Sequence, residues 1–280
     1  MIHAYAPSCS CGWRASAGSG WAAWTTEVLE ALAAGLRGPL LRLDDPSYDA
    51  ARAVWNGAID CRPAAIARCA GTADVLHAVN VARSAGLTVA VRSGGHSFAG
   101  YSTCEGGLVI DLSGLTGIRM DVDARRARCG AGTLWGDLDH ETQAFAQAAP
   151  GGVISHAGVA GLTLGGAWGG STVGSASRAT TSSRPMSPTA DGHFVRASEG
   201  ENPDLFWGLL GSGGNFGIVT RGGHAGPGAG TACGGVPQPA GHSEVPQEDP
   251  PPAPARRSAC GTRTRFTGDA GASATIGYWA

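Results

Sequence analysis

Apolar residues three and four positions apart predict three helices along the chain. They lie within residues 25–43, 74–86 and 134–147. Thr72 is the expected N-cap of the second helix, because a short polar side chain can accept hydrogen bonds from the first free amides. Gly86 is its expected end, since glycine adopts the left-handed conformation that terminates a helix. Thr133 is the expected N-cap of the third helix.

Shorter apolar runs predict strands between these helices. Residues 87–91 and 108–112 have the composition of buried strands. Residues 118–132 alternate apolar and polar positions and turn at Asp123 and Ala124, which predicts a hairpin. The order helix, strand, strand, hairpin, helix predicts an α+β fold, because a doubly wound parallel sheet requires strict alternation of strands and helices.

Two stretches lack the apolar residues that a packed element needs. Residues 169–190 contain only Val173 and Met186 as larger aliphatic residues, so they read as an irregular insert or a frameshifted stretch. Residues 221–280 contain eight prolines and twelve glycines but no leucine, and we expect this tail to be disordered. A flexible linker or an interaction tail is the alternative interpretation.

Composition and charge exclude some classes of partner. The 280 residues carry a net charge of −2, so no broad basic surface is expected, and neither nucleic acid nor a membrane is an expected partner. All 20 basic residues are arginines, which codon bias in a GC-rich genome explains. No apolar run approaches the length of a membrane span, and the N-terminus has no apolar targeting segment. A cytoplasmic location is therefore the expectation.

The eight cysteines do not predict a metal site. They form no Cys-x-x-Cys pair and have no histidine at matching spacing, so neither a zinc site nor a thioredoxin-like motif is expected. A chain of this length can also build a core without disulfides.

Glycine gathers in four clusters that could bring backbone amides close to a ligand. The clusters are 93–102, 130–136, 151–170 and 211–217. Successive amides in a glycine-rich loop can converge on an anion such as a pyrophosphate, although a single cluster is more simply a tight turn. The cluster at 130–136 resembles a dinucleotide fingerprint, but the preceding strand is too charged and the glycine spacing one residue too long.

Two histidines lie inside these clusters. The neighbours of His96 are Gly94, Gly95 and Ser97, which leave the imidazole accessible to a flat ligand at the end of a strand. A solvent-exposed turn histidine is the simpler alternative for His96 taken alone. His156 is either a residue of a pocket wall or a hydrogen-bonded core histidine. Burying the loop around it is costly unless its amides find partners, which a phosphate-bearing cofactor would supply.

Several motifs in one order and spacing resemble the FAD-binding domain of berberine bridge enzyme-like oxidases, in the vanillyl-alcohol oxidase and p-cresol methylhydroxylase superfamily. The motifs are RPAAIARCAGTADVLHAVNVARSAGLTVAVRSGGHSFAGYS, GLVIDLSGL, GGVISHAGVAGLTLGG and VRASEGENPDLFWGLLGSGGNFGIVT. The resemblance covers roughly residues 55–220, with a gap at 169–190. It implies an N-terminal helical segment at 1–54, an FAD-binding domain of the p-cresol methylhydroxylase type at 55–220 and the tail at 221–280.

The resemblance also implies the residues that hold the cofactor. His96 takes the position of the histidine that is bonded to the 8α-methyl group of the flavin. Ile154 stands where bicovalent members carry a cysteine, so His96 is the only expected covalent attachment. The other implied FAD-binding residues are Arg92, Ser93, Gly94, Gly95, Ser97, His156, Gly158, Val159, Gly161, Leu162, Thr163, Gly165, Gly166, Ile218 and Val219.

The implied function is that of an FAD-dependent oxidoreductase. It would take a hydride from the carbon that bears a hydroxyl of an alcohol or sugar and pass electrons to dioxygen. No catalytic base is identified, because His140, Tyr101 and His156 are each better explained as structural residues. Nothing in 221–280 resembles the family's substrate domain, and the pattern is lost and regained around 169–190, which favours a truncated and frameshifted chain. The alternatives are a truncated flavin-binding module and an inactive remnant.

Overall fold

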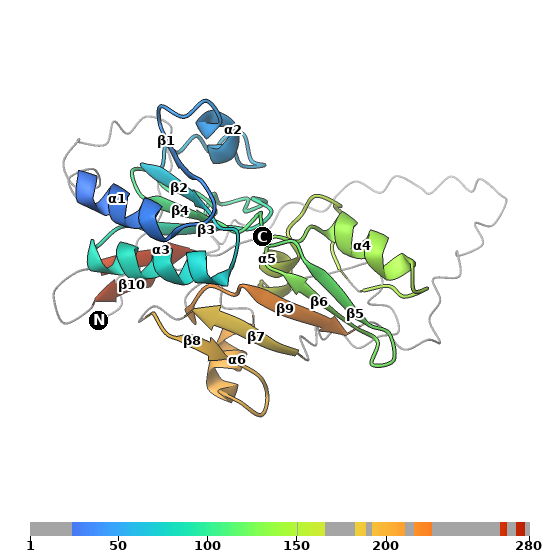
Figure 1. Cartoon of the computed structure of the whole chain (residues 1–280). Coiled ribbons are helices and arrows are strands. Elements are labelled where there is room, and N and C mark those ends of the chain that lie inside the picture. The colour runs from blue at the N-terminus through green and yellow to red at the C-terminus, as the bar shows by residue number, and fades with distance from the viewer. Residues whose placement is uncertain are drawn as a thin grey trace, which may run out of the picture.

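The computed structural model contains two β-sheets with helices packed around them (Figure 1). It describes residues 24–149, 151–165, 183–188, 192–210, 216–225, 264–267 and 273–277. The mixture of a partly parallel sheet, an antiparallel sheet and separate helices confirms the α+β class expected from the sequence.

The first sheet has a parallel centre with antiparallel edges. Its strands, in spatial order, are β1 (Leu40–Arg42), β2 (Ala65–Arg68), β4 (Leu108–Asp111), β3 (Val89–Arg92), β11 (Ser273–Gly277) and β10 (Thr264–Thr267). β2, β4, β3 and β11 run parallel, whereas β1 and β10 are antiparallel to their neighbours. The parallel strands β2, β3 and β4 are nearly continuous apolar runs, as expected for strands covered on both faces.

The second sheet is antiparallel throughout. Its strands, in spatial order, are β5 (Ile118–Asp121), β6 (Arg126–Gly130), β9 (Arg221–Ala225), β7 (Ser183–Pro188) and β8 (Phe194–Arg196). β5 and β6 pair from Ile118 with Cys129 to Asp121 with Arg126, which confirms the predicted hairpin.

Helices cover the two sheets and connect their strands. They are α1 (Thr26–Gly35), α2 (Tyr48–Arg52), α3 (Thr72–Ser84), α4 (Trp135–Gln143), α5 (Val159–Leu164) and α6 (Pro203–Leu209). α3 is the crossover between β2 and β3, and α1 lies along it (Figure 1). α5 lies between the two sheets in the same view. Gly35 permits the close approach of α1 to α3, because a Cβ there would lie 2.4 Å from the ring of His77.

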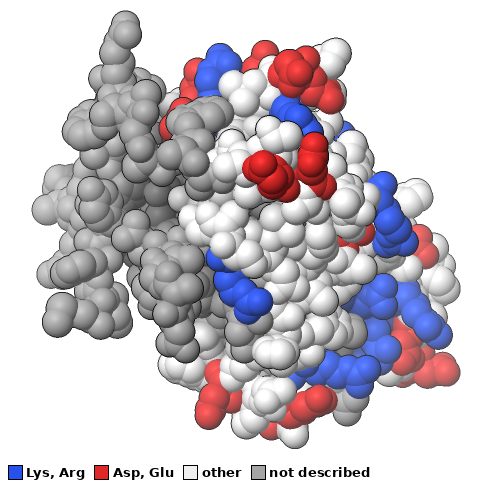
Figure 2. Space-filling view, turned by 60° about the vertical axis from the view of Figure 1, so that its left-hand side comes forward, with Lys and Arg blue, Asp and Glu red and all other residues white. Residues whose placement is uncertain are grey.

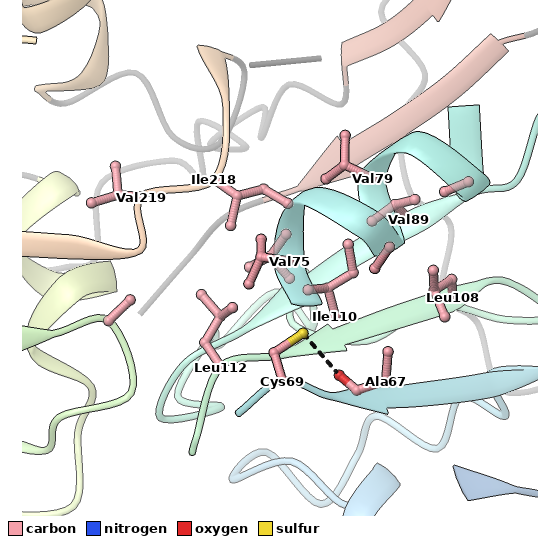
Figure 3. Close-up of a cluster of buried hydrophobic side chains, with 14 of the residues drawn as sticks. Ala67, Cys69, Val75, Val79, Val89, Leu108, Ile110, Leu112, Ile218 and Val219 are labelled. Atoms are coloured by element: carbon pink, nitrogen blue, oxygen red, sulfur yellow. Dashed lines mark hydrogen bonds between the residues drawn. The ribbon is translucent and has the colours of Figure 1, made fainter. Parts of the chain in front are cut away.

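The main core lies between α3 and the parallel strands (Figure 3). Val75 and Val79 of α3 belong to one hydrophobic cluster with Leu108 and Ile110 of β4, and all four side chains are buried. Each such side chain contributes about 1.5–3 kcal/mol of hydrophobic stabilisation. The apolar spacing that predicted the helix at 74–86 is therefore the spacing that fills this core.

Three local predictions need correction. The stretch 25–43 is not one helix, because α1 ends at Gly35 and β1 follows. Gly38 turns the chain between them, in a position where a Cβ would lie 1.7 Å from the carbonyl oxygen of Arg68. The N-cap of α3 is Gly71 rather than Thr72, and the N-cap of α4 is Leu134 rather than Thr133, whose side chain is buried.

The stretches that the sequence marks as irregular contain some described strands. β7 lies within 169–190, and β9, β10 and β11 lie within 221–280. The remainder of 169–190 and most of the tail lie outside the described residues, so their disorder stays a prediction. β1 pairs with β2, which makes part of the N-terminal segment 1–54 an edge of the first sheet.

The described residues contain neither a candidate membrane-spanning helix nor a candidate cluster of metal ligands. Within the described residues, no helix is long and apolar enough to span a bilayer. The same residues contain no group of three histidine, cysteine or acidic side chains that could hold a metal ion. On the face shown in Figure 2, acidic and basic side chains lie around a largely uncharged middle, and the two signs are mixed.

A buried carboxylate joins the loop after α1 to the first turn of α3. Asp74 is 1% exposed, and its carboxylate accepts hydrogen bonds from the amides of Ala70 at 2.8 Å and Gly38 at 3.3 Å. Arg37 pairs with the same group. Burial alone would raise the pKa of Asp74, but these hydrogen bonds outweigh it and hold the pKa below its ordinary value.

We expect Asp74→Asn to lower the free energy of unfolding by about 1–3 kcal/mol. The side-chain NH2 group of asparagine replaces one carboxylate oxygen, so one buried N–H group loses its acceptor. Urea unfolding of the full chain near pH 7 measures this. The wild-type advantage is present above the unfolded-state pKa of about 3.9 and is lost as the pH falls through the lower native pKa. The difference between the two proteins should therefore shrink in acid.

Asp44→Asn is the control, because Asp44 is exposed and should change the free energy of unfolding by less than about 0.5 kcal/mol. Equal destabilisation by the two substitutions would contradict a structural role for Asp74.

Candidate functional site

Two glycine-rich loops meet beside the end of the central parallel strands. The first, residues 93–97, follows β3, and the second, residues 151–158, precedes α5. Their positions follow from the fold, because β3 is paired with β4 on one side and with β11 on the other. The carboxyl end of a parallel strand is a common place for a ligand to bind.

The loops touch through their backbones at Gly94 and Gly158. A Cβ at Gly94 would lie 2.3 Å from the amide nitrogen of Gly158, and a Cβ at Gly158 would lie 2.6 Å from the amide nitrogen of Gly94. No side chain fits between them at these distances. The glycines are therefore required for contact between the loops, whatever else they bind.

Two serine hydroxyls hold the first loop in shape. Ser93 Oγ donates to the carbonyl oxygen of Ala131 at 2.5 Å, and Ser97 Oγ accepts from the amide of Tyr101 at 3.0 Å. Between them, Gly95 has a φ of +71°, a conformation that other residues rarely adopt. Both serines were predicted to line the cofactor, and the structure places their hydroxyls in bonds that shape the loop.

The segment after α2 supports the same loop from the other side. The amide of Trp55 donates to the carbonyl oxygen of Gly95 at 3.1 Å, and the side chain of Asn56 donates to the carbonyl oxygen of Phe98 at 2.8 Å. Arg92 Nη1 donates to the carbonyl oxygen of Ala51. Arg92 is thus tied to the end of α2, beneath the loop that it was expected to line.

Three rings gather at the tip of the first loop. His96 stacks on Trp55, with ring centroids 5.2 Å apart and planes inclined by 22°. On its edge, His96 Nε2 lies 2.5 Å from His156 Nδ1. Burial of the His96 ring, and to a lesser extent the neighbouring His156, lower the pKa of His96 below its ordinary value. The contacts with Trp55 and His156 therefore orient the His96 imidazole, and the lowered pKa favours its neutral form.

The amides of the first loop are available to a ligand. The N–H groups of Gly94, Gly95 and His96 donate to none of the residues that the structure describes. Neighbouring amides without protein partners can bind an anion, such as a diphosphate. Together with a stacked imidazole, they fit a ligand that has both a flat ring and a phosphate group.

The other predicted site residues fall into two groups. Gly158 is the N-cap of α5 and Gly165 its C-cap, so both lie at the ends of the helix that follows His156. Within α5, Val159, Gly161 and Thr163 are buried, whereas Leu162 is partly buried against the cluster around Trp135. Gly166 lies outside the described residues.

Ile218 and Val219 lie in the main core rather than in the loop cluster. Ile218 is fully buried and Val219 is 3% exposed, and both belong to the cluster that contains Val75 and Ile110 (Figure 3). Their proposed position beside the adenosine half of the cofactor stays a prediction. His140 is exposed on α4, and Tyr101 is buried.

The glycine cluster at 130–136 has a packing explanation. A Cβ at Gly130 would lie 1.9 Å from the carbonyl oxygen of Leu115, and one at Gly132 would lie 2.0 Å from that of Leu112. These glycines let the strand end pass close to the chain after β4. Backbone packing therefore explains these glycines, and no bound nucleotide is needed to account for their resemblance to a dinucleotide fingerprint.

The sequence analysis missed Trp55 and Asn56. Both lie at the edge of the predicted domain, next to no glycine cluster, so no local motif marks them. The structure supplies the signal that the sequence lacks, because Trp55 is a large apolar side chain that remains 53% exposed.

Comparison with known proteins agrees with this geometry. Residues 63–198 match the family model described as "FAD binding domain". The chain is 38% identical over 186 residues to (R)-6-hydroxynicotine oxidase from Paenarthrobacter nicotinovorans, which covers 66% of this chain and 41% of that protein. The chain thus spans about two-fifths of this curated relative.

Solved structures show the same domain. The chain matches Physcomitrella patens BBE-like 1 with a TM-score of 0.68 and 29% identity, over 71% of this chain and 44% of that one. It matches glucooligosaccharide oxidase from Acremonium strictum with a TM-score of 0.63 and 28% identity, over 71% of this chain and 42% of that one. That structure is described as holding a 6-S-cysteinyl, 8α-N1-histidyl FAD.

We expect Gly94→Ala to separate the two loops, because the added Cβ meets backbone atoms that cannot rotate away. Such overpacking costs about 1–3 kcal/mol. The variant should unfold at lower urea concentration and keep less FAD than wild type after gel filtration, as measured by absorbance at visible wavelengths.

Gly117→Ala is the matched control, since a Cβ there meets nothing within 4 Å and it should leave FAD retention unchanged. Undiminished FAD retention and stability in Gly94→Ala would show that the loops do not need their backbone contact.

Proposed function

Because residues 63–198 match the family model described as "FAD binding domain", we propose that the chain is the flavin-holding part of an FAD-linked oxidoreductase. The observation that supports this most is the backbone contact of Gly94 with Gly158, which brings His96 and His156 together from loops that are 60 residues apart. Beside this contact lie an imidazole stacked on Trp55 and loop amides without partners among the described residues, which fit a ligand with a flat ring and a diphosphate.

The described residues suggest how the cofactor is held. The free amides of Gly94, Gly95 and His96 would bind the diphosphate, since they have no partner among the described residues. His96 would be bonded to the flavin through the 8α carbon. Ile154 is 41% exposed beside this loop and has no thiol, so one covalent attachment is proposed rather than two.

The proposed reaction is the oxidation of an alcohol or sugar. When bound, FAD accepts a hydride from a carbon that bears a hydroxyl group, and dioxygen is the proposed electron acceptor. The name of one relative, glucooligosaccharide oxidase, supports a sugar as the substrate. The name of another, (R)-6-hydroxynicotine oxidase, leaves room for a different substrate.

A second candidate function is a flavin-binding module without turnover. It is supported by the coverage of the comparisons, in which this chain accounts for 41% of the hydroxynicotine oxidase and 44% of the moss protein. It is also supported at the site itself, where no carboxylate contacts the His96 ring among the described residues. Both candidates bind FAD, and turnover separates them.

We expect the wild-type chain, incubated with FAD, to keep its yellow colour in the protein pellet after acid precipitation. His96→Ala should bind FAD in native buffer but release it into the acid supernatant, because the bond to the 8α carbon is gone. Visible absorbance of pellet and supernatant measures both. His140→Ala, which changes an exposed histidine on α4, should behave as wild type.

Colour in the supernatant of the wild-type chain would overturn covalent attachment, and a colourless native protein would overturn FAD binding itself. Hydrogen peroxide formation with a panel of sugars and alcohols then tests the oxidase. Absence of peroxide from a chain that holds FAD covalently would favour the module.

A further inference from the structure

The contact between His96 and His156 is more specific than cofactor binding requires. His96 Nε2 lies 2.5 Å from His156 Nδ1, and the ring planes are inclined by 38° with centroids 4.5 Å apart. A hydrogen bond between two neutral imidazoles needs one nitrogen that carries a proton and one that does not. The contact therefore couples the positions of the protons on the two rings.

The surroundings decide which ring donates. His156 is exposed, so its Nε2 can keep a proton that is hydrogen-bonded to water, and its Nδ1 is then an acceptor. His96 then carries its proton on Nε2. This arrangement uses the commoner tautomer of both rings, because a free imidazole side chain prefers the proton on Nε2.

The position of this proton determines the state of the other ring nitrogen of His96, Nδ1. With the proton on Nε2, Nδ1 has a free lone pair, and no described residue donates a hydrogen bond to it. Trp55 stacks on one face of the ring and does not occupy Nδ1 with a hydrogen bond. A nucleophilic nitrogen needs such a lone pair and a neutral ring.

We propose that His156 is a positioning residue for covalent attachment of the flavin: it holds the proton of His96 on Nε2, leaves Nδ1 as the nucleophile, and accepts the Nε2 proton when the bond forms. This inference rests on the proposed attachment of FAD to His96. It adds a role for His156, which the sequence left as either a pocket-wall or a core histidine.

The step balances with dioxygen as the oxidant. A bond would form between His96 Nδ1 and the 8α carbon, and one C–H bond of that carbon would break, with its proton released to water. The ring would carry a positive charge after this bond forms, and loss of the Nε2 proton to His156 Nδ1 removes it. The two electrons left on the flavin pass to dioxygen, which takes up two protons and becomes hydrogen peroxide.

The downward shift of the His96 pKa is consistent with this role. Burial first, and His156 second, favour the neutral form of the ring. A protonated His96 would have no lone pair on either nitrogen and could not attack. The same two features that hold the ring in place therefore also keep it reactive.

The test compares His156→Asn with His156→Leu in the full chain. The two side chains have nearly the same shape, but only asparagine can place an acceptor oxygen where His156 Nδ1 lies. Each protein is mixed with FAD, samples are precipitated in acid over time, and the flavin in the pellet is measured. FAD retained in native gel filtration serves as the measure of binding.

We expect all three proteins to bind FAD in native buffer. Covalent attachment should be slower in His156→Leu by a factor on the order of a hundred, and His156→Asn should recover most of the wild-type rate. A merely structural role would slow both variants alike or weaken FAD binding in both.

A second measurement needs no variant. Nitrogen-15 NMR of the imidazole groups in the wild-type chain before FAD is added should show the proton of His96 on Nε2 and none on Nδ1. A proton on Nδ1 would overturn the inference, even if His156→Leu fails to fold.

The outcomes separate this inference from the proposed function. Wild-type and His156→Leu chains that attach FAD at equal rates would overturn the role of His156 and leave the attachment to His96 standing. A wild-type chain that binds FAD and releases all of it into acid would overturn the attachment, and the role of His156 with it.

Discussion

The site depends on one backbone contact, the passage of Gly94 against Gly158. The two backbones are so close that neither residue has room for a Cβ, so the loops are in direct backbone contact. Every feature of the site follows from that approach. The imidazole of His96 reaches His156, and the amides of Gly94, Gly95 and His96 donate to none of the described residues.

The rest of the fold fixes the ends of these loops. β3 holds the first loop by its pairing with β4, and Ser93 ties it to Ala131 after β6. The amide of Val159, the first residue of α5, donates to the carbonyl oxygen of Thr133, so the second loop is tied to the same turn. Two loops far apart in sequence thus share one support.

The sequence predicted the parts whose signal is local. The helix at 74–86 and the hairpin at 118–132 follow from periodicity, and the structure confirms both as α3 and as β5 with β6. The caps were wrong at Thr72 and Thr133, because capping depends on the exact residue at which the helix begins. Trp55 could not be predicted, since only the folded chain brings it to His96. The break after α1 was also missed, although the sequence contains Gly38, the residue that permits the close turn there.

The surroundings of His96 show how a small fold meets opposing demands on one side chain. A ring that must bond to a ligand has to be open to it, yet an open histidine in solvent rotates freely and is partly protonated near neutral pH. Here glycine removes side chains from the approach to the ring, while Trp55 and His156 restrain it by its face and by one edge. Partial burial, and to a lesser extent His156, lowers the pKa of His96 and so favours the neutral ring. Access is therefore set by the glycines, whereas orientation and protonation share a neighbour, because His156 both contacts the ring and lowers its pKa.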